Sequence, residues 1–287
     1  MGLIVLVSCL AVAGCGGLVR QATAPMIDGL SAAIQKQNDP QTVRDGAPAY
    51  LLLADGLVEN SPNDPETLAT AARLYSSYTS AFVLGDDPAR AKRLTWRARD
   101  YAFRAAALKK PKFGALWDKP YPEFAPVADE FQAGDEELLY LVIGAWVGII
   151  QADSGNWDRL AEISKVKLLT ERLLALDEGY YYGAGHLLLG VLAGILPPAL
   201  GGKPDEAKAH FERAIELSQG KFLLAFVYYA QNYAKVVYDR ELYEKLLHRV
   251  LDTPADVVPE LTLVNTLARQ QAEKLLAEAA TIFDQEG

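Results

Sequence analysis

The sequence predicts an all-α protein in which TPR-like helical hairpins stack into an irregular solenoid or bundle. Apolar residues recur at helical spacing through most of the chain after Met26. Clusters of proline, glycine and aspartate divide the chain into segments of ordinary helix length. Strand patterns do not alternate with helix patterns, which argues against a parallel sheet.

The clearest helical pattern covers residues 259–283. Its apolar residues fall on or near one helix face: Leu261, Val264, Leu267, Ala268, Leu275, Ile282 and Phe283. We expect Pro259 in the first turn, where its missing N–H group has no helical partner to lose. The clusters expected to separate helices elsewhere are residues 61–65, 85–88, 134–135 and 252–254.

Two segments lack charged residues over long stretches. Residues 138–152 are too short to span a membrane, and residues 179–202 are interrupted by Pro197 and Pro198. A helix that is apolar on all sides is typical of the interior of a helical protein. We therefore predict that both segments form buried helices.

The N-terminal residues 2–19 carry no charge, which is typical of a membrane span or of a signal peptide. Residues 12–15 read Val-Ala-Gly-Cys, which matches a bacterial lipobox: an aliphatic residue, two small residues and a cysteine. This pattern predicts cleavage before Cys15 and lipidation of that cysteine. The usual basic start of a signal is missing, since Arg20 is the first basic residue. An uncleaved anchor helix is the alternative.

The predicted organisation has three parts. A lipoprotein signal peptide covers residues 1–14, the lipidated cysteine and a short tether cover 15–25, and a single TPR-like helical domain covers 26–287. The acyl chains would hold the domain on the periplasmic face of a bacterial membrane. Gly16 stands where an aspartate retains some lipoproteins in the inner membrane, so the outer membrane is favoured.

The composition excludes several classes of function. The formal net charge is -9 and there is no long basic run, which argues against nucleic-acid binding. The two cysteines, Cys9 and Cys15, cannot build a disulfide framework in the body of the protein. The histidines His186, His210 and His248 are too far apart in sequence for a helical metal pair. No cofactor is implied.

The sequence carries no recognisable catalytic motif, and we predict that the protein is not an enzyme. The G-x-S-x-G and H-E-x-x-H patterns are both missing from the chain. Acidic pairs such as Glu136-Glu137 are explained by favourable charge at helix ends. An all-helical hydrolase or lyase that uses such a pair is the alternative from another class of function.

One segment has the spacing of the second helix of a TPR unit. In residues 203–217 the small and aromatic positions are Ala207, Phe211, Ala214 and Ile215. The pair Leu189-Gly190 stands where the first helix of the unit has a glycine that permits close packing. Residues 87–106 and 228–250 repeat the pattern more weakly, without a strict period. A plain irregular helical bundle is the alternative.

Several residues are candidates for binding a ligand or a partner. Three consecutive tyrosines cannot all face one core, so at least one is expected to reach a cleft or an interface, where the ring packs and the hydroxyl bonds. A histidine in an apolar stretch, a tryptophan near it in the fold and a proline-rich loop complete the set. These candidates are Tyr180, Tyr181, Tyr182, His186, Trp146, Pro197 and Pro198. Interhelical packing is the alternative role for the aromatic residues.

From about Asp55 to the C-terminus the chain resembles the T component of TRAP transporters, the TatT family. The resemblance depends on ordered landmarks rather than on one motif. These landmarks are residues 65–68 with Tyr75 and Tyr78, residues 91–98, residues 136–146, residues 179–190 with 197–202 and 207–211, and residues 261–265 with 268 and 272–276. The segment that ends in Pro197-Pro198-Ala199-Leu200-Gly201-Gly202 is the most specific of them.

The resemblance implies a function that the periodicity alone does not. A protein of this family is a periplasmic lipoprotein that associates with the substrate-binding P component of a TRAP transport system, and a homotrimer is expected. The implied ligand is a small hydrophobic molecule or an organic acid. A general TPR scaffold for envelope protein assembly is the alternative within the class of binding proteins.

Overall fold

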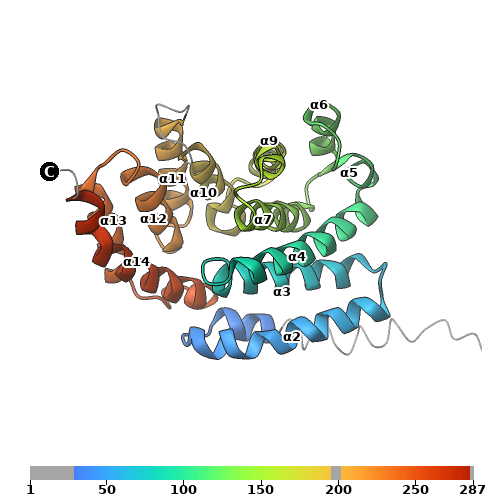
Figure 1. Cartoon of the computed structure of the whole chain (residues 1–287), viewed down its shortest axis with the longest axis horizontal. Helices are drawn as coiled ribbons and strands as arrows, with labels where there is room; N and C mark the ends of the chain where they lie inside the picture. The colour runs from blue at the N-terminus through green and yellow to red at the C-terminus, as the bar shows by residue number, and fades with distance from the viewer. Residues whose placement is uncertain (1–28, 195–201, 285–287) are drawn as a thin grey trace, which may run out of the picture.

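The computed structural model describes residues 29–194 and 202–284 and shows an all-α protein (Figure 1). No strand occurs within these two ranges, which confirms the predicted fold class. Cys15, Pro197 and Pro198 lie outside the described residues. The subdivision into signal peptide, tether and domain therefore stays a prediction.

The first half of the molecule contains the helices that follow the N-terminal segment. They are α2 (Pro40–Asn60), α3 (Pro65–Phe82), α4 (Pro88–Lys109), α5 (Pro111–Leu116), α6 (Tyr121–Phe124), the 3₁₀ helix η1 (Ala125–Glu130) and α7 (Glu136–Ala152). The second half continues with α8 (Trp157–Ala161), α9 (Ile163–Leu176), α10 (Tyr180–Gly194), α11 (Pro204–Leu217), α12 (Leu224–Tyr229), the π-helical segment η3 (Ala230–Ala234), α13 (Arg240–Asp252), η4 (Pro259–Leu261) and α14 (Thr262–Phe283).

Helices α2, α3 and α4 all begin with the same sequence motif, an aspartate followed by a proline. Asp39, Asp64 and Asp87 are the N-cap residues of α2, α3 and α4, and each carboxylate accepts a hydrogen bond from a backbone N–H of the first turn. The proline that follows each aspartate has a φ angle suited to the helix and no N–H group to satisfy. The sequence itself therefore sets where these helices start.

A first core joins the helices of the N-terminal half. Figure 1 shows α2, α3, α4 and α7 as successive layers, each packed against the next. The uncharged segment 138–152 forms α7, which contributes the fully buried Leu139, Ile143 and Trp146. None of the described helices is both long enough and apolar enough to cross a bilayer.

A second core joins α10, α11, α12, α13 and α14. Helices α10 and α11 approach closely in this core, since a Cβ atom added at Gly190 would lie 2.9 Å from the ring of Phe211. Ala207 and Ala214 are fully buried on the same face of α11 as Phe211. The predicted packing of Gly190 against this helix is thus confirmed, whereas the stacking of TPR-like repeats into a solenoid stays a prediction.

The chain bends so that its last helix returns to its first layers. In Figure 1 the start of α14 lies near α2 and α3, and contacts between α14 and α2 support that arrangement. Lys36 and Glu260 form an ion pair at 3.6 Å across this contact. The two cores therefore face each other around a central region, which contains the cavities described below.

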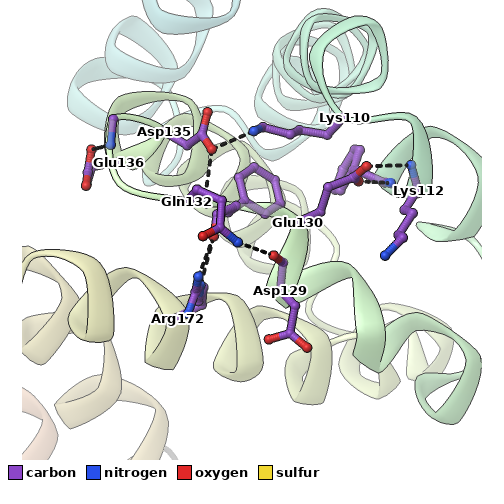
Figure 2. A network of polar contacts seen from close by, with 11 residues as sticks. Lys110, Lys112, Asp129, Glu130, Gln132, Asp135, Glu136 and Arg172 are labelled. Carbon is purple, nitrogen blue, oxygen red and sulfur yellow. Dashed lines mark hydrogen bonds and ion pairs between the residues drawn. The ribbon is translucent and has the colours of Figure 1, made fainter.

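A polar network fixes the short helices at one end of the first core (Figure 2). Lys110 Nζ lies 2.5 Å from an Asp135 carboxylate oxygen, which joins the end of α4 to the start of α7. The carboxylate of Glu130 accepts the backbone N–H groups of Lys112 and Phe113 at the start of α5. The guanidinium of Arg172 on α9 donates two hydrogen bonds to the carbonyl oxygen of residue 131. These bonds connect segments that are far apart in sequence.

Candidate functional site

Two cavities lie between the two cores and share one wall. The first, which we name the α7 chamber, has a volume of about 370 Å³ and lies among α3, α4, α7, α10 and α12. The second, the α14 chamber, has a volume of about 400 Å³ and lies among α2, α3, α12 and α14. The residues that line both are Ser80, Tyr140, Phe222, Leu224 and Tyr228. The two chambers together form the candidate site.

Small residues on α7 make room for the α7 chamber. Gly144, Ala145 and Gly148 line it, and a Cβ atom added at Gly144 would meet no atom within 4 Å. Among the residues that the structure describes, no aspartate, glutamate, lysine, arginine or histidine lines it. Its polar groups are hydroxyls and amides from Ser76, Thr79, Ser80, Thr95, Tyr140, Gln151, Tyr228, Gln231 and Asn232. The chamber therefore suits an uncharged molecule with a few hydrogen-bonding groups.

Two hydroxyls on the wall of the α7 chamber have no hydrogen-bond partner within residues 29–194 and 202–284. Thr79 is 1% exposed and its Oγ1 is unsatisfied, and the buried Oγ of Ser76, one turn earlier on α3, is also unsatisfied. By contrast, Thr95 Oγ1 on α4 donates to the carbonyl oxygen of Ala91 at 2.9 Å. A buried hydroxyl without a partner is unfavourable. Ser76 and Thr79 therefore offer hydrogen bonds that a bound molecule can complete.

Tyr140 and Tyr228 separate the two chambers. Burial raises the pKa of Tyr140 above its ordinary value, with a smaller effect from the neighbouring tyrosines, and burial also raises the pKa of Tyr228. Both phenols are therefore neutral at physiological pH and keep their O–H donors. The ring centroid of Tyr140 lies 5.5 Å from that of Tyr180 and 5.5 Å from that of Tyr181.

A left-handed turn at the start of α10 directs the three consecutive tyrosines. The φ angles are 43° at Tyr181, 60° at Tyr182 and 79° at Gly183. The left-handed region is unfavourable by about 1–2 kcal/mol per non-glycine residue. As a result Tyr180 packs on Tyr140, Tyr181 lines the α14 chamber, and Tyr182 packs against the second core. Strained backbone is thus concentrated at the mouth of the candidate site.

The α14 chamber has a mixed lining. Most of its wall is apolar or aromatic, but Arg73 and Glu260 contribute charge at its edge. Arg73 forms an ion pair with Glu137 at the start of α7. Of the described lining residues, the charged ones therefore belong to the α14 chamber and not to the α7 chamber.

The remaining predicted site residues lie elsewhere. Trp146 is fully buried in the first core, where its Nε1 donates to Glu162 Oε2 at 2.8 Å, and it lines neither chamber. His186 lies outside both chambers, with its Nδ1 2.8 Å from His210 Nδ1 and its Nε2 3.0 Å from Glu178 Oε1. Both positions have a packing or pairing role in the described structure.

Sequence reasoning did not single out several residues of the chambers. Thr79, Tyr140 and Phe222 come from three separate helical regions, and nothing in their local sequence marks them as neighbours. The sequence feature that could have indicated a cavity beside α7 is its group of small residues, Gly144, Ala145 and Gly148. Within the ranges that the structure describes, no group of three or more histidine, cysteine, aspartate or glutamate side chains could hold a metal ion.

Comparison with known proteins identifies the family. The model of the family described as TRAP transporter T-component matches residues 36–283. No curated protein matches the chain. The family consists of accessory components of a transport system and is not a known enzyme family. The chain therefore belongs to the TRAP transporter T-component family and has an accessory role in a TRAP system.

Proposed function

We propose that this protein is a lipid-anchored periplasmic component of a TRAP system that binds the substrate-binding P protein and holds an uncharged organic ligand. Membership of the T-component family supports the association with a TRAP system. The lipobox that ends at Cys15 supports the anchor. The observation that carries the ligand assignment is the α7 chamber, which is lined by apolar side chains and neutral polar groups.

The charge-free lining favours one of the two ligand classes that the family resemblance implies. An organic acid in the α7 chamber would bury its carboxylate without a cationic partner on the chamber wall. The burial of an unpaired charge is unfavourable by several kcal/mol. A small hydrophobic molecule gains from the apolar wall, and its hydroxyl or amide can bond to Ser76 and Thr79.

A matched pair of fluorescent probes tests this assignment. The neutral N-phenyl-naphthylamine and the anionic anilinonaphthalene sulfonate share an aromatic body and differ by a sulfonate. We expect the neutral probe to bind more tightly, and the Gly144→Leu variant, whose added side chain narrows the α7 chamber at its wall, to bind it less tightly. Gly56→Leu, at an exposed position of α2, is the matched control, since no atom lies within 4 Å of its added Cβ either. Tighter binding of the anionic probe would contradict the assignment.

The partner is tested by affinity capture. Residues 17–287 are used as bait in an envelope extract at near-physiological salt, and captured proteins are identified by mass spectrometry. A P-type substrate-binding protein at stoichiometric yield is the expected result. Capture of envelope assembly machinery in its place would favour the general TPR scaffold.

The anchor and the oligomer have separate tests. Metabolic labelling with radioactive palmitate should label the full chain in cells and fail to label the Cys15→Ala variant. Membrane fractionation should recover the labelled protein with the outer membrane, as Gly16 predicts. Light scattering of the purified protein should give three times the mass of one protomer if the expected homotrimer forms.

A further inference from the structure

An arginine on α4 is buried in a cage of aromatic rings. Arg99 is 4% exposed. Its Cζ atom lies 5.0 Å from the ring centroid of Trp96, 4.8 Å from that of Phe103 and 4.7 Å from that of Trp117. Aromatic faces attract a guanidinium, so the rings explain part of the stability of this buried charge.

The aromatic rings leave the hydrogen-bond donors of Arg99 unused. A guanidinium has five N–H groups in one plane, and these need acceptors at its edge. The Nε of Arg99 is buried with no hydrogen-bond partner, and no described residue forms an ion pair with this side chain. Burial lowers the pKa of Arg99 from its ordinary value, although the group still carries its charge at neutral pH.

Two more cations lie in the same cluster. The Cζ atom of Arg159 on α8 lies 4.9 Å from the ring centroid of Trp96, and its buried Nε also lacks a partner. Lys165 is 7% exposed and donates from Nζ to the carbonyl oxygen of Trp117 at 2.9 Å. Arg99 and Arg159 therefore approach the same indole ring with unsatisfied donors.

The carboxylates near this cluster do not balance its charge. Glu162 lies among the three cations, but its Oε1 accepts from Arg159 Nη1 at 2.9 Å and its Oε2 accepts from the Trp146 indole. Asp100, the next carboxylate, forms an ion pair with Arg104 at 3.1 Å. Asp118 is exposed at the edge of the cluster. The buried part of the cluster thus has three cations and one carboxylate.

We propose that Arg99 and Arg159 form a binding site for a small oxyanion, a carboxylate or a phosphate group, beside Trp96. The planar fork of a guanidinium matches the two oxygens of such a group, and each arginine has donors free for it. The burial of Arg99 keeps most water away from its guanidinium, which strengthens its interaction with a bound charge. None of Trp96, Arg99 and Arg159 lines the α7 chamber, so the site is separate from that of the neutral ligand.

The test is a fluorescence titration of the purified full chain. The tryptophans Trp96 and Trp117 contact Arg99 and report its environment, and Trp157→Phe removes the most exposed tryptophan from the signal. The probes are sodium phosphate, sodium sulfate and sodium acetate, with sodium chloride added to hold the ionic strength constant. We expect a saturable change with at least one probe and none with chloride alone. Preference for acetate identifies a carboxylate site, and preference for phosphate or sulfate identifies a site for tetrahedral oxyanions.

Variants on the same helix locate the site. Arg99→Met keeps the volume and packing of the side chain, and it should lower the association constant at least about tenfold, as expected for lost charge-assisted hydrogen bonds. Arg93→Met removes an exposed arginine of α4 and should leave binding unchanged. Arg159→Gln provides a second test if Arg99→Met does not fold.

Two results would overturn the proposal. One is a titration in which none of the three oxyanions gives a saturable response. The other is unchanged affinity in the folded Arg99→Met and Arg159→Gln variants. Either result would leave the cluster with a structural role in joining α4, α5 and α8. Because the neutral probe binds elsewhere, its success or failure does not affect this test.

Discussion

Two threonines on the wall of the α7 chamber show how residues of the same type differ in their surroundings. Thr95 Oγ1 donates to the carbonyl of Ala91 on its own helix, as threonines in helices commonly do. Thr79 Oγ1 has no partner although the residue is 1% exposed. The sequence presents both as ordinary helical threonines. Only the environment of each hydroxyl decides which one is available to a ligand.

We predict opposite effects on stability for the two Thr→Val variants. Thr79→Val keeps the shape and removes an unsatisfied buried hydroxyl, so the free energy of unfolding should stay unchanged or increase by about 1 kcal/mol. Thr95→Val removes a formed hydrogen bond and should lower that free energy by about 1 kcal/mol. Urea denaturation followed by circular dichroism measures both. A loss of stability in Thr79→Val equal to that in Thr95→Val would show that the Thr79 hydroxyl has a partner in solution.

At the scale of elements, the contact between α10 and α11 depends on a missing side chain. A Cβ atom at Gly190 would lie 2.9 Å from the Phe211 ring, closer than atoms of this kind approach each other. Phe211 is fully buried and stacks on Tyr229 with ring centroids 5.3 Å apart, so it cannot move away freely. The glycine therefore sets the distance between the two helices.

We predict that Gly190→Ala lowers the free energy of unfolding by about 1–3 kcal/mol, the range expected for overpacking of a core. Gly56→Ala on α2 is the matched control, because its added Cβ meets no atom within 4 Å. That control should gain up to about 1 kcal/mol, since alanine favours the helix over glycine. Urea denaturation of both variants checks this, and equal stability of the two would contradict the close approach of α10 and α11.

A histidine pair adds a pH-dependent contact between the same helices. His186 Nδ1 and His210 Nδ1 are 2.8 Å apart, so one ring must accept while the other donates. Burial lowers the pKa of His210 from 6.5, with a further effect from His186. The unfolded chain therefore takes up a proton more readily than the folded chain as the pH falls through 6.5. Above pH 6.5 His210 is neutral in both states and its full contribution to the free energy of unfolding is present. That contribution decreases as the pH falls from 6.5 to the lower pKa that His210 has in the folded protein.

We predict that His210→Gln reduces the loss of stability between about pH 8 and about pH 5.5. The partner Glu178 does not interfere, because its hydrogen bonds from Arg213 and His186 lower its pKa from 4.5 to about 2 and its stabilisation is lost only below that window. His248→Gln, at an exposed position of α13, is the control that removes a histidine outside this pair. Urea midpoints at the two pH values give the comparison. An unchanged pH dependence in His210→Gln would contradict the assignment.

At the scale of the whole molecule, the two chambers lie where two separately packed cores meet. Ile143 belongs to the first core, and Leu187 and Phe222 belong to the second. All three line the α7 chamber. A molecule in this space contacts both cores at once. Its binding therefore opposes unfolding of the whole domain rather than of one helix.

We predict that the neutral N-phenyl-naphthylamine probe stabilises the whole domain. At a free concentration of about one hundred times its Kd, the free energy of unfolding should increase by about 2.7 kcal/mol. In the Gly144→Leu variant the same concentration should give less stabilisation, because the added side chain narrows the chamber. Thermal unfolding followed by circular dichroism measures the effect. Equal stabilisation of both proteins would place the probe outside the α7 chamber.

The sequence by itself determined the helical class, the starts of several long helices and the family. Asp-Pro pairs begin α2, α3 and α4, and the helical spacing near Pro259 predicts α14, because capping and amphipathicity act over a few neighbouring residues. The pairing of Gly190 with the Phe211 helix was also predictable, since both belong to one recognisable local unit. These features depend on interactions between residues that are close in sequence, so they can be predicted from the sequence alone.

The tertiary structure alone decided the chemistry of the candidate sites. Thr79, Tyr140 and Asn232 meet at one chamber although they are far apart in sequence, and His186 meets His210 only because α10 packs on α11. The local sequence of Arg99 shows a basic amphipathic helix and gives no sign that the guanidinium is buried among rings. Hydrogen-bond satisfaction and burial depend on all the neighbours of a group, and most of those neighbours come from distant segments.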